Sequence, residues 1–438
     1  MSTTAANSAL DGHLENFRRL DAGAPATLRA LRERALERFA AAGFPTVRLE
    51  DWKYTNVAAL AAKPFHLEDE RVPPAAGILA AAARLGSGIE LVFVNGHYAP
   101  TLSNAADLPG GAVIGSLKEA LRAHPELIEP HLGRYAPFDE AAESLTALNT
   151  AFIADGVFVY LPVGLALEQP IHCLFLSLPS NGPAVAHPRI LVVAGEGSRA
   201  TVIEQYAGSG SYWTNAVTEA VIGAGASVTH YKVQREGADA FHVGSVAVEQ
   251  AAGSTFASLA VSLGGALTRT DIATRLDAPG AACTFDGLYL ASAAQHVDHH
   301  TTIDHRQPRG TSRELYKGIL TDRATGVFNG KVFVRPHAQQ SDAQQMNKNL
   351  LLSDDAQIDT KPQLEILADD VKCSHGATIG QLDDDAIFYL RSRGIDAPEA
   401  RQLLIFAFAN ELIAKVAVDP LREQLTRDVE SRLHNPPA

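Results

Sequence analysis

A cysteine and a histidine that stand two residues apart, Cys373 and His375, have the most informative chemistry in the sequence. They belong to the run Val371-Lys-Cys-Ser-His-Gly-Ala-Thr378. If this run is a β-strand, the two side chains point to the same face, because alternate residues of a strand share a face. A thiolate beside an imidazole suits a metal such as iron or zinc, or a nascent metal cluster.

Two ligands hold a metal only weakly, so a site built on Cys373 and His375 would need further ligands from elsewhere, such as another subunit. The alternative is a buried cysteine next to a hydrogen-bonded histidine at the end of the core. The residues themselves leave both interpretations open.

A second candidate is the run His296-Val-Asp-His-His-Thr-Thr-Ile-Asp-His305, which is unusually rich in histidine and aspartate. On a strand, His296, Asp298 and His300 share one face, whereas His299 points to the other. Imidazole and carboxylate groups together can bind a metal. The same alternation also fits a solvent-facing ladder of polar side chains, so this run indicates a metal site or a polar sheet surface.

Other catalytic patterns are missing from the sequence. It has no phosphate-binding loop of the form G-x-x-x-x-G-K-[ST], so ATP hydrolysis by that route is not expected. It has no dinucleotide fingerprint inside a strand–helix–strand unit and no G-x-S-x-G nucleophile turn. No flavin motif is recognisable either, and flavin binding stays open.

The composition is that of an ordinary globular protein, with 46% hydrophobic and 20% charged residues in 438, enough for two or three domains. The net charge of −13 argues against nucleic acid and anionic membrane surfaces as partners, because both require a dense basic face. We therefore expect neither a nucleic-acid nor a membrane partner.

Three features predict a cytoplasmic protein. Residues 1–20 are polar and lack the apolar stretch of a signal peptide. The most apolar segment, Leu403 to Val418, is interrupted by polar and charged residues and is too short to span a bilayer. The three cysteines are far apart and form no CxxC pair, which suits a reducing compartment.

A repeat organises the middle of the chain. Gly197, Gly225, Gly253 and Gly280 are spaced 28, 28 and 27 residues apart, and each opens a turn that leads into a strand. Strands and tight turns at a fixed period, without helices between them, are typical of a solenoid in which each coil covers the next. We therefore predict a mainly β protein with a β-helix core; a stack of two-sheet sandwich domains is the alternative.

Helical segments are expected on both sides of this core. Leu28, Leu31, Ala35 and Phe39 form one face of a helix, and Asp396-Ala-Pro-Glu399 has the arrangement of a capping box. We predict an N-terminal helical domain over residues 1–90, the β-helix over 91–382 and a C-terminal helical domain over 383–438. The helical termini are expected to cover the open ends of the solenoid, with Trp52 as an anchor of the N-terminal helices.

Several motifs, in their order and spacing, resemble those of the SufB/SufD family from about residue 48 to about 415. The segments that carry the resemblance are Glu50-Asp-Trp-Lys-Tyr-Thr55, Gln295-His-Val-Asp298, Phe328-Asn-Gly-Lys331, Asn347-Lys-Asn-Leu-Leu-Leu-Ser353, Thr360-Lys-Pro-Gln-Leu-Glu365, Val371 to Thr378 and Ile387-Phe-Tyr-Leu-Arg-Ser-Arg-Gly-Ile395. The chain looks like the D-type branch, because Leu390 stands where the B-type branch has a cysteine.

The resemblance implies a right-handed parallel β-helix flanked by helical domains. It also implies a scaffold subunit that is not an enzyme, in a complex that assembles iron–sulfur clusters with a SufB-like paralogue and two copies of the SufC-like ATPase. By analogy, His375, and with it Cys373, would lend a ligand to iron or a cluster bound transiently at the interface with the paralogue. The C-terminal helices would dock the ATPase. Arg309-Gly310 departs from the family pattern, which puts a ligand role near His305 in doubt.

Two other functions compete with this expectation. The chain could be a purely structural stabiliser of its SufB-like partner, with no ligand role. It could instead be a β-helix enzyme that acts on carbohydrate, with Asp298, Asp304 and Arg306 as candidate charges. The enzyme alternative predicts secretion and a groove rich in aromatic residues, which the missing signal peptide and the 7% aromatic content oppose.

Overall fold

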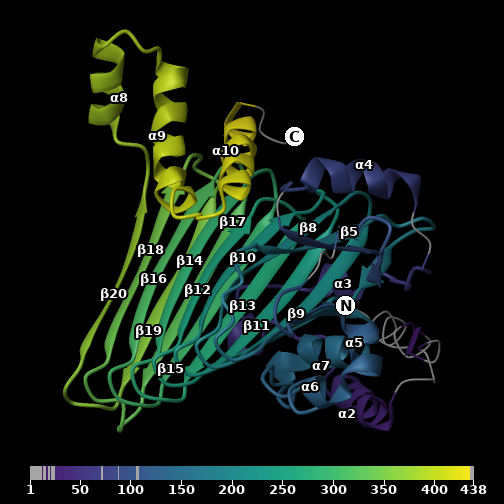
Figure 1. The fold of residues 1–438 in the computed structure, drawn as a ribbon. Helices are drawn as coiled ribbons and strands as arrows, with labels where there is room; N and C mark the ends of the chain where they lie inside the picture. Colours follow the sequence, from purple (N-terminus) through teal and green to yellow (C-terminus); the bar gives the residue numbers. More distant parts are fainter. Residues whose placement is uncertain are drawn as a thin grey trace.

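The computed structural model describes residues 12, 16–17, 20, 25–70, 73–86, 88–104 and 108–434. Its centre is formed by two ten-stranded sheets that face each other (Figure 1). Helices lie on both sides of this centre in sequence. Most of residues 1–20, on which the prediction of a leader-free N-terminus depends, lie outside the described residues.

The strands alternate between the two sheets along the chain, as in a β-helix. From β8 onward each strand pairs in parallel with the strand two further along. Sandwich domains would instead consist of mainly antiparallel sheets. The prediction of a parallel β-helix is therefore confirmed.

The first sheet contains β1 Ile89–Val94, β2 His97–Tyr98, β5 Ile171–Ser177, β8 Arg199–Gly208, β10 Ser227–Arg235, β12 Thr255–Ser262, β14 Ala282–Ala291, β16 Thr311–Leu320, β18 Asp342–Leu351 and β20 Lys372–Gly380. The second sheet contains β3 Val113–Ser116, β4 Gly156–Leu161, β6 Ala184–Ala186, β7 Arg189–Ala194, β9 Tyr212–Ile222, β11 Phe241–Gln250, β13 Leu267–Leu276, β15 His296–His305, β17 Thr325–Val334 and β19 Gln357–Ile366.

The glycines that revealed the repeat all occupy one turn of successive coils. Gly197, Gly225, Gly253 and Gly280 have φ values of 64, 63, 61 and 73°, a left-handed conformation that glycine adopts without a steric penalty. The same turn continues at Arg309 and Gln340, each with φ of 61°. Each of these N–H groups donates to a carbonyl of the next coil. The repeat therefore extends two coils beyond the point where the glycine signal ends.

Parallel pairing in register brings equivalent positions of successive coils into columns. The columns that face inward hold the main apolar core, for example Val202, Phe256, Phe285, Ile303 and Val332. Consequently, any residue can be assigned to the inner or outer face from its partner one coil earlier. This register decides which way each candidate side chain points.

Most of the N-terminal helices cover the outer face of the second sheet, whereas α4 packs on the outer face of the first sheet against β1 and β5. Their bounds are α2 Ala26–Ala42, η1 Glu50–Trp52, α3 Ala58–Ala61, α4 Pro74–Ala83, α5 Leu117–Ala123, α6 Pro125–Ile128, η2 Ala141–Glu143 and α7 Ser144–Ala151. The predicted face of α2 is buried at Leu28, Ala35 and Phe39. Phe39 belongs to the same apolar cluster as Trp213 of β9. Helices α5 to α7 follow β1 to β3 in sequence, so helical structure extends beyond residue 90.

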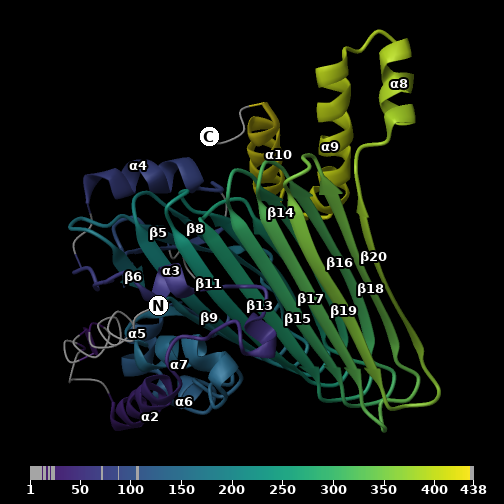
Figure 2. The same ribbon diagram turned by 180° about the vertical axis from the view of Figure 1, so that it is seen from behind.

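The C-terminal helices are α8 Asp384–Ser392, α9 Ala397–Ile413 and α10 Asp419–His434. The Asp396 side chain accepts the Glu399 N–H at 2.8 Å, as the capping motif predicts. Leu412 of α9 and Leu425 of α10 are buried with Leu288, which lies on the outer face of the first sheet. Helix α8 and the outer part of α9 project away from the sheets, as both views show (Figure 2).

The solenoid ends at strands β19 and β20, which are the last strands of their sheets among the described residues. Most of β20 is exposed, although the helical termini were expected to cover this end. That expectation is wrong here, because α9 and α10 lie on the outer face of the first sheet instead. No helix within the described part of the chain is long and apolar enough to cross a membrane.

Candidate functional site

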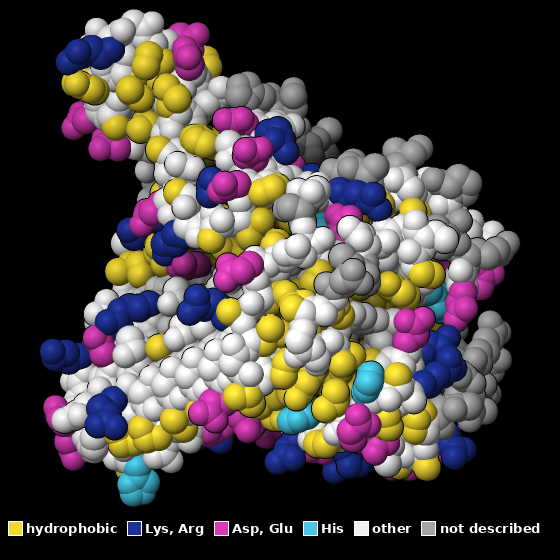
Figure 3. All heavy atoms as spheres, in the orientation of Figure 1, with side chains coloured by type: hydrophobic (Ala, Val, Ile, Leu, Met, Phe, Trp, Pro, Cys, Tyr) yellow, Lys and Arg dark blue, Asp and Glu magenta, His cyan; other side chains and the backbone are white. Residues whose placement is uncertain are grey.

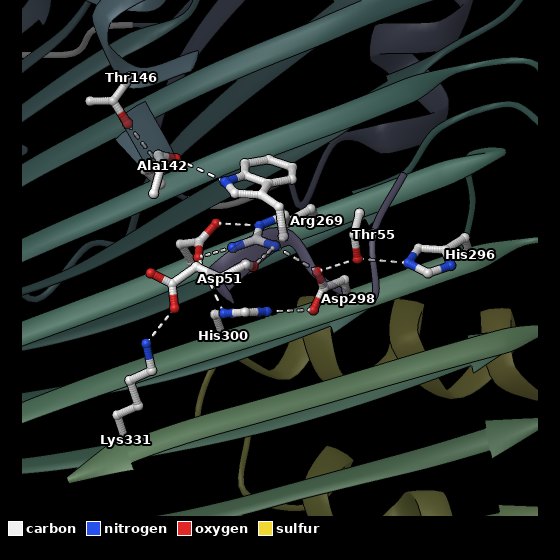
Figure 4. Close-up of polar contacts among 12 residues, drawn as sticks. Asp51, Thr55, Ala142, Thr146, Arg269, His296, Asp298, His300 and Lys331 are labelled. Atoms are coloured by element: carbon white, nitrogen blue, oxygen red, sulfur yellow. Dashed lines mark hydrogen bonds and ion pairs between the residues drawn. The ribbon is translucent and has the colours of Figure 1, made fainter. Parts of the chain in front are cut away.

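A polar cluster joins the N-terminal segment to the outer face of the second sheet (Figure 4). Asp298 of β15 is its centre. Arg269 of β13 lies beside it, since the register pairs these two positions of adjacent coils. Thr55 reaches Asp298 from the segment that follows η1, and His300 lies two residues further along β15. The cluster therefore combines neighbouring coils with a distant part of the chain.

Within the described residues, the polar contacts of the buried Asp298 carboxylate come from side chains of this cluster. Its Oδ2 accepts hydrogen bonds from Thr55 Oγ1 at 2.5 Å and Arg269 Nη1 at 2.9 Å, and His300 Nε2 lies 3.0 Å from Oδ1. Burial alone would raise the pKa of Asp298, but His300, Arg269 and the Thr55 hydrogen bond lower it well below its usual range. Asp298 is therefore a carboxylate at neutral pH.

Arg269 binds the N-terminal segment as well as the solenoid. Its guanidinium lies 3.8 Å from the centre of the Trp52 ring, and its Nη1 donates to the Asp51 carbonyl at 2.7 Å. It also donates to both carboxylate oxygens of Asp271 at 2.9 Å. Trp52 in turn donates from Nε1 to the Ala142 carbonyl at 2.9 Å. Trp52 is thus an anchor, as predicted, and it anchors the N-terminal segment to β13.

Two lysines from later coils complete this attachment. Lys331 of β17 forms an ion pair with Asp51, and Lys361 of β19 forms one with Glu50. Four of the segments that carry the sequence resemblance therefore meet at one surface. They are Glu50–Thr55, Gln295–Asp298, Phe328–Lys331 and Thr360–Glu365. Arg269, Thr55 and Asp51 were not among the predicted site residues. Thr55 and Asp51 lie in a segment that carries the resemblance, but only Arg269 had a signal for its position, since one coil of the repeat separates it from Asp298.

The structure places His296, Asp298 and His300 on one face of β15 and His299 on the other, as predicted. Thr55 has one proton, which it donates to Asp298, so His296 Nε2 donates to Thr55 Oγ1 at 2.9 Å. Burial is the main reason why the pKa of His296 is lowered. Within the described ranges no group of three or more His, Cys, Asp and Glu side chains is placed to hold a metal ion. A metal at His296, Asp298 and His300 stays a prediction.

The carbohydrate-enzyme alternative named Asp298, Asp304 and Arg306 as its candidate charges. Six residues along a strand correspond to about 20 Å, whereas the two carboxyl groups of glycosidases are roughly 5–10 Å apart. Asp304 is also held by Arg306 at 2.8 Å and by Arg335 at 2.7 Å. This spacing does not fit a glycosidase pair formed by Asp298 and Asp304.

The departure at Arg309-Gly310 lies next to His305. A Cβ atom at Gly310 would lie 2.6 Å from His305 Nδ1, so only glycine fits against this ring. His305 Nε2 bonds Ser312 Oγ at 2.9 Å, and burial lowers its pKa to about 4. His305 is a neutral residue of the solenoid interior.

Cys373 and His375 lie on β20, at the open end of the first sheet. Their Cα partners on β18 are Ala343 and Gln345, which are buried and face inward. Cys373 and His375 therefore share the inward face, as the two-residue spacing predicts. Cys373 is half-buried against the apolar core, and His375 is exposed because no further coil covers it in the described chain.

The three cysteines differ sharply in environment. Cys173 and Cys283 are buried in the solenoid interior, and Cys373 is the most accessible. Burial, with a smaller contribution from Asp342, raises the pKa of the Cys373 thiol. Cys373 is thus mainly a thiol at neutral pH unless a metal or a cationic partner displaces its proton.

A second exposed surface lies on the C-terminal helices. Phe388 and Tyr389 of α8 are 72% and 58% exposed, and Leu403 of α9 is 44% exposed. Figure 3 shows hydrophobic side chains gathered on the knob formed by α8 and α9, with charged groups around them. A group of large apolar side chains that are exposed together typically marks a surface that binds another molecule.

Comparison with known proteins identifies the family. The model of the "SUF system FeS cluster assembly, SufBD core domain" matches residues 177–408, and that of the "SufBD protein N-terminal region" matches residues 6–173. An iron–sulfur cluster assembly SufBD family protein of Synechocystis is 35% identical over 89% of this chain and 87% of its own length. The iron–sulfur cluster assembly protein SufD of Escherichia coli is 33% identical over 91% of both chains. This chain belongs to the SufBD family of the SUF system for iron–sulfur cluster assembly and is a homologue of SufD.

Proposed function

We propose that this chain is a non-ATPase scaffold subunit of an iron–sulfur cluster assembly complex, and that it lends His375 as a ligand at the interface with a SufB-like paralogue. The observation that carries the proposal is the place of Cys373 and His375 on the exposed last strand of the solenoid. Iron, or the growing cluster, is the cargo of this site rather than a resident cofactor.

The open end supports a partner of the same architecture. The outer edges of β19 and β20 present backbone groups that no strand of the described chain pairs with, and such edges readily accept strands of another chain. Ile366, Leu367 and Ile379, which lie at this end, are exposed. A second solenoid with matching coils would cover both the backbone and the apolar side chains.

The need for a second chain also follows from the number of ligands. Cys373 and His375 offer one sulfur and one imidazole, and a tetrahedral iron site requires about four donors. The remaining donors would come from the paralogue at the interface. His375 is the stronger candidate of the two, because it is exposed, whereas Cys373 contacts the apolar core.

We further propose that the knob of α8 and α9 docks the SufC-like ATPase. Its exposed Phe388, Tyr389 and Leu403 are the kind of side chains that dominate protein interfaces. Helices α9 and α10 are attached to the outer face of the first sheet. Motion of the ATPase would therefore be transmitted to the sheet that ends in β20.

Iron loading of the reconstituted complex tests the ligand role. The complex of His375→Ala with its paralogue and ATPase should assemble normally but bind less iron and yield less cluster than wild type. His124→Ala is a matched control, because His124 follows α5, which packs on β3 and β4 at the opposite end of the solenoid. If the His375→Ala complex loads iron normally, the chain is a structural stabiliser of its partner and the ligand role is refuted.

A further inference from the structure

Three side chains of successive coils form one inward-facing column at the open end of the solenoid. Glu314 of β16 pairs with Gln345 of β18, and Gln345 pairs with His375 of β20. Glu314 and Gln345 are only 5% and 2% exposed. The column therefore starts in the buried interior and ends at the exposed imidazole.

The orientation of the Gln345 amide is fixed by Glu314. Gln345 Nε2 donates a 2.6 Å hydrogen bond to Glu314 Oε2. The nitrogen end of the amide thus points back into the solenoid, and its oxygen end is turned away from Glu314. Gly330 of β17 allows this position from the opposite sheet, since a Cβ atom there would lie 2.1 Å from Gln345 Nε2.

The oxygen of this amide lacks a donor within the described structure. Gln345 Oε1 is buried and has no hydrogen-bond partner among the described residues. An unsatisfied buried acceptor costs about 1–3 kcal/mol, so a nearby donor would relieve this cost. The side chain that follows Gln345 in the column is His375, whose imidazole ring carries the N–H donor that Oε1 lacks.

We propose that Gln345 is a positioning residue for His375: its Oε1 accepts the N–H of one ring nitrogen and leaves the other ring nitrogen to bind iron. Glu314 acts one step further back by holding the amide in the required orientation. This inference rests on the proposed ligand role of His375. Histidines that bind metals commonly donate their second ring N–H to such an acceptor, and loss of the acceptor typically lowers metal affinity about 10–100-fold.

Ferrous iron binding to the reconstituted complex of this chain, the paralogue and the ATPase tests the proposal. Gln345→Met keeps the length of the side chain but removes the acceptor, and should weaken iron binding about 10–100-fold. Gln344→Met is the matched control, because Gln344 is the neighbouring residue, is exposed and faces outward. Its complex should bind iron as wild type does.

A rescue variant separates positioning from a general effect on the fold. The double variant Glu314→Gln with Gln345→Glu exchanges donor and acceptor, so the bond between the two residues and the acceptor for His375 are both kept. It should restore iron affinity to within a few-fold of wild type. Failure of the exchange to restore binding, in a complex that assembles normally, would overturn the proposal.

A double-mutant cycle distinguishes this inference from the proposed function itself. If Gln345 acts through His375, Gln345→Met causes no further loss of iron affinity in the His375→Ala background. An equal loss in both backgrounds, or wild-type binding by Gln345→Met when His375→Ala binds poorly, refutes positioning but keeps the ligand role. Wild-type binding by His375→Ala refutes the ligand role, and the positioning role falls with it.

Discussion

Thr55 donates a 2.5 Å hydrogen bond to Asp298, although 243 residues separate the two in the chain. The bond is one part of the attachment between the N-terminal segment and the outer face of the solenoid, with Arg269 at its centre. Nearly all charged side chains of this attachment form ion pairs within the chain. The cluster therefore fixes the N-terminal helices to the coils of the solenoid.

Replacement of Arg269 by alanine should destabilise the protein strongly. The change leaves the buried Asp298 carboxylate without its arginine partner, and the loss of one partner of a buried pair costs about 3–5 kcal/mol. Denaturant unfolding measures this difference. Arg306→Ala is the control, because its partly exposed ion pairs with Asp277 and Asp304 should contribute less than about 1 kcal/mol. Equal effects of the two variants would contradict the role of Arg269.

Glu314→Gln should change how stability depends on pH. Burial is the main reason why the pKa of Glu314 is raised to about 7, although Thr301 and the hydrogen bond from Gln345 lower it. Between its unfolded pKa of 4.5 and about 7, the folded state holds a proton that the unfolded state releases. The free energy of unfolding of wild type therefore falls as pH rises through this window.

Glutamine has no titratable group, so the Glu314→Gln variant does not lose unfolding free energy in this way as the pH rises. From about pH 5 to about pH 8, its stability relative to wild type should rise by roughly 3 kcal/mol, from about 1.4 kcal/mol per pKa unit. Other titrating groups contribute to both proteins and cancel in the difference. Urea unfolding at several pH values measures it, and a difference that does not vary with pH would show that Glu314 is ionised throughout.

Alkylation should distinguish Cys373 from the two other cysteines. Iodoacetamide requires an accessible thiolate, and Cys173 and Cys283 are buried with raised pKa values, chiefly because of burial. Mass spectrometry of the native chain should therefore find label at Cys373 first, and assembly with the paralogue should protect it. Early labelling of Cys173 or Cys283 in the folded chain would contradict the described core.

Polar substitutions on the C-terminal knob should abolish ATPase capture without unfolding the chain. Serine at Phe388, Tyr389 and Leu403 removes exposed apolar side chains, so the stability of the chain should change by less than about 0.5 kcal/mol per site. Each interface anchor is worth about 2 kcal/mol or more, and the loss of all three should prevent copurification. Val163→Ser, at a 74% exposed position elsewhere, is the matched control. Unchanged capture by the triple variant would place the ATPase elsewhere.

Much of the fold could be predicted because the glycines of the turns recur at a regular spacing. Their period gives the coil, and the coil with strand alternation gives the face of each residue, which placed Cys373 with His375 and His296 with Asp298 correctly. The coils at Arg309 and Gln340 were harder to find, since these residues adopt the same positive φ without glycine. Their backbone is held by the hydrogen bonds of adjacent coils.

The contacts between distant segments could not be predicted in the same way. Nothing near Thr55 or Asp51 in sequence indicates that they meet Asp298 and Lys331, because this pairing depends on where the N-terminal helices cross the sheet. The uncovered end at β20 was missed for a related reason. The apolar residues of α9 do not show which surface the helix covers, and Leu403 among them is exposed.

The most direct test of the central claim is a measurement of nitrogen ligation to the cluster. This chain, labelled with ¹⁵N-histidine, is assembled with unlabelled paralogue and ATPase, loaded with a cluster, reduced and studied by electron spin-echo envelope modulation. The account predicts a ¹⁵N coupling that is lost in His375→Ala and kept in His124→Ala. A labelled wild-type complex without ¹⁵N coupling, or a coupling that survives in His375→Ala, would contradict it.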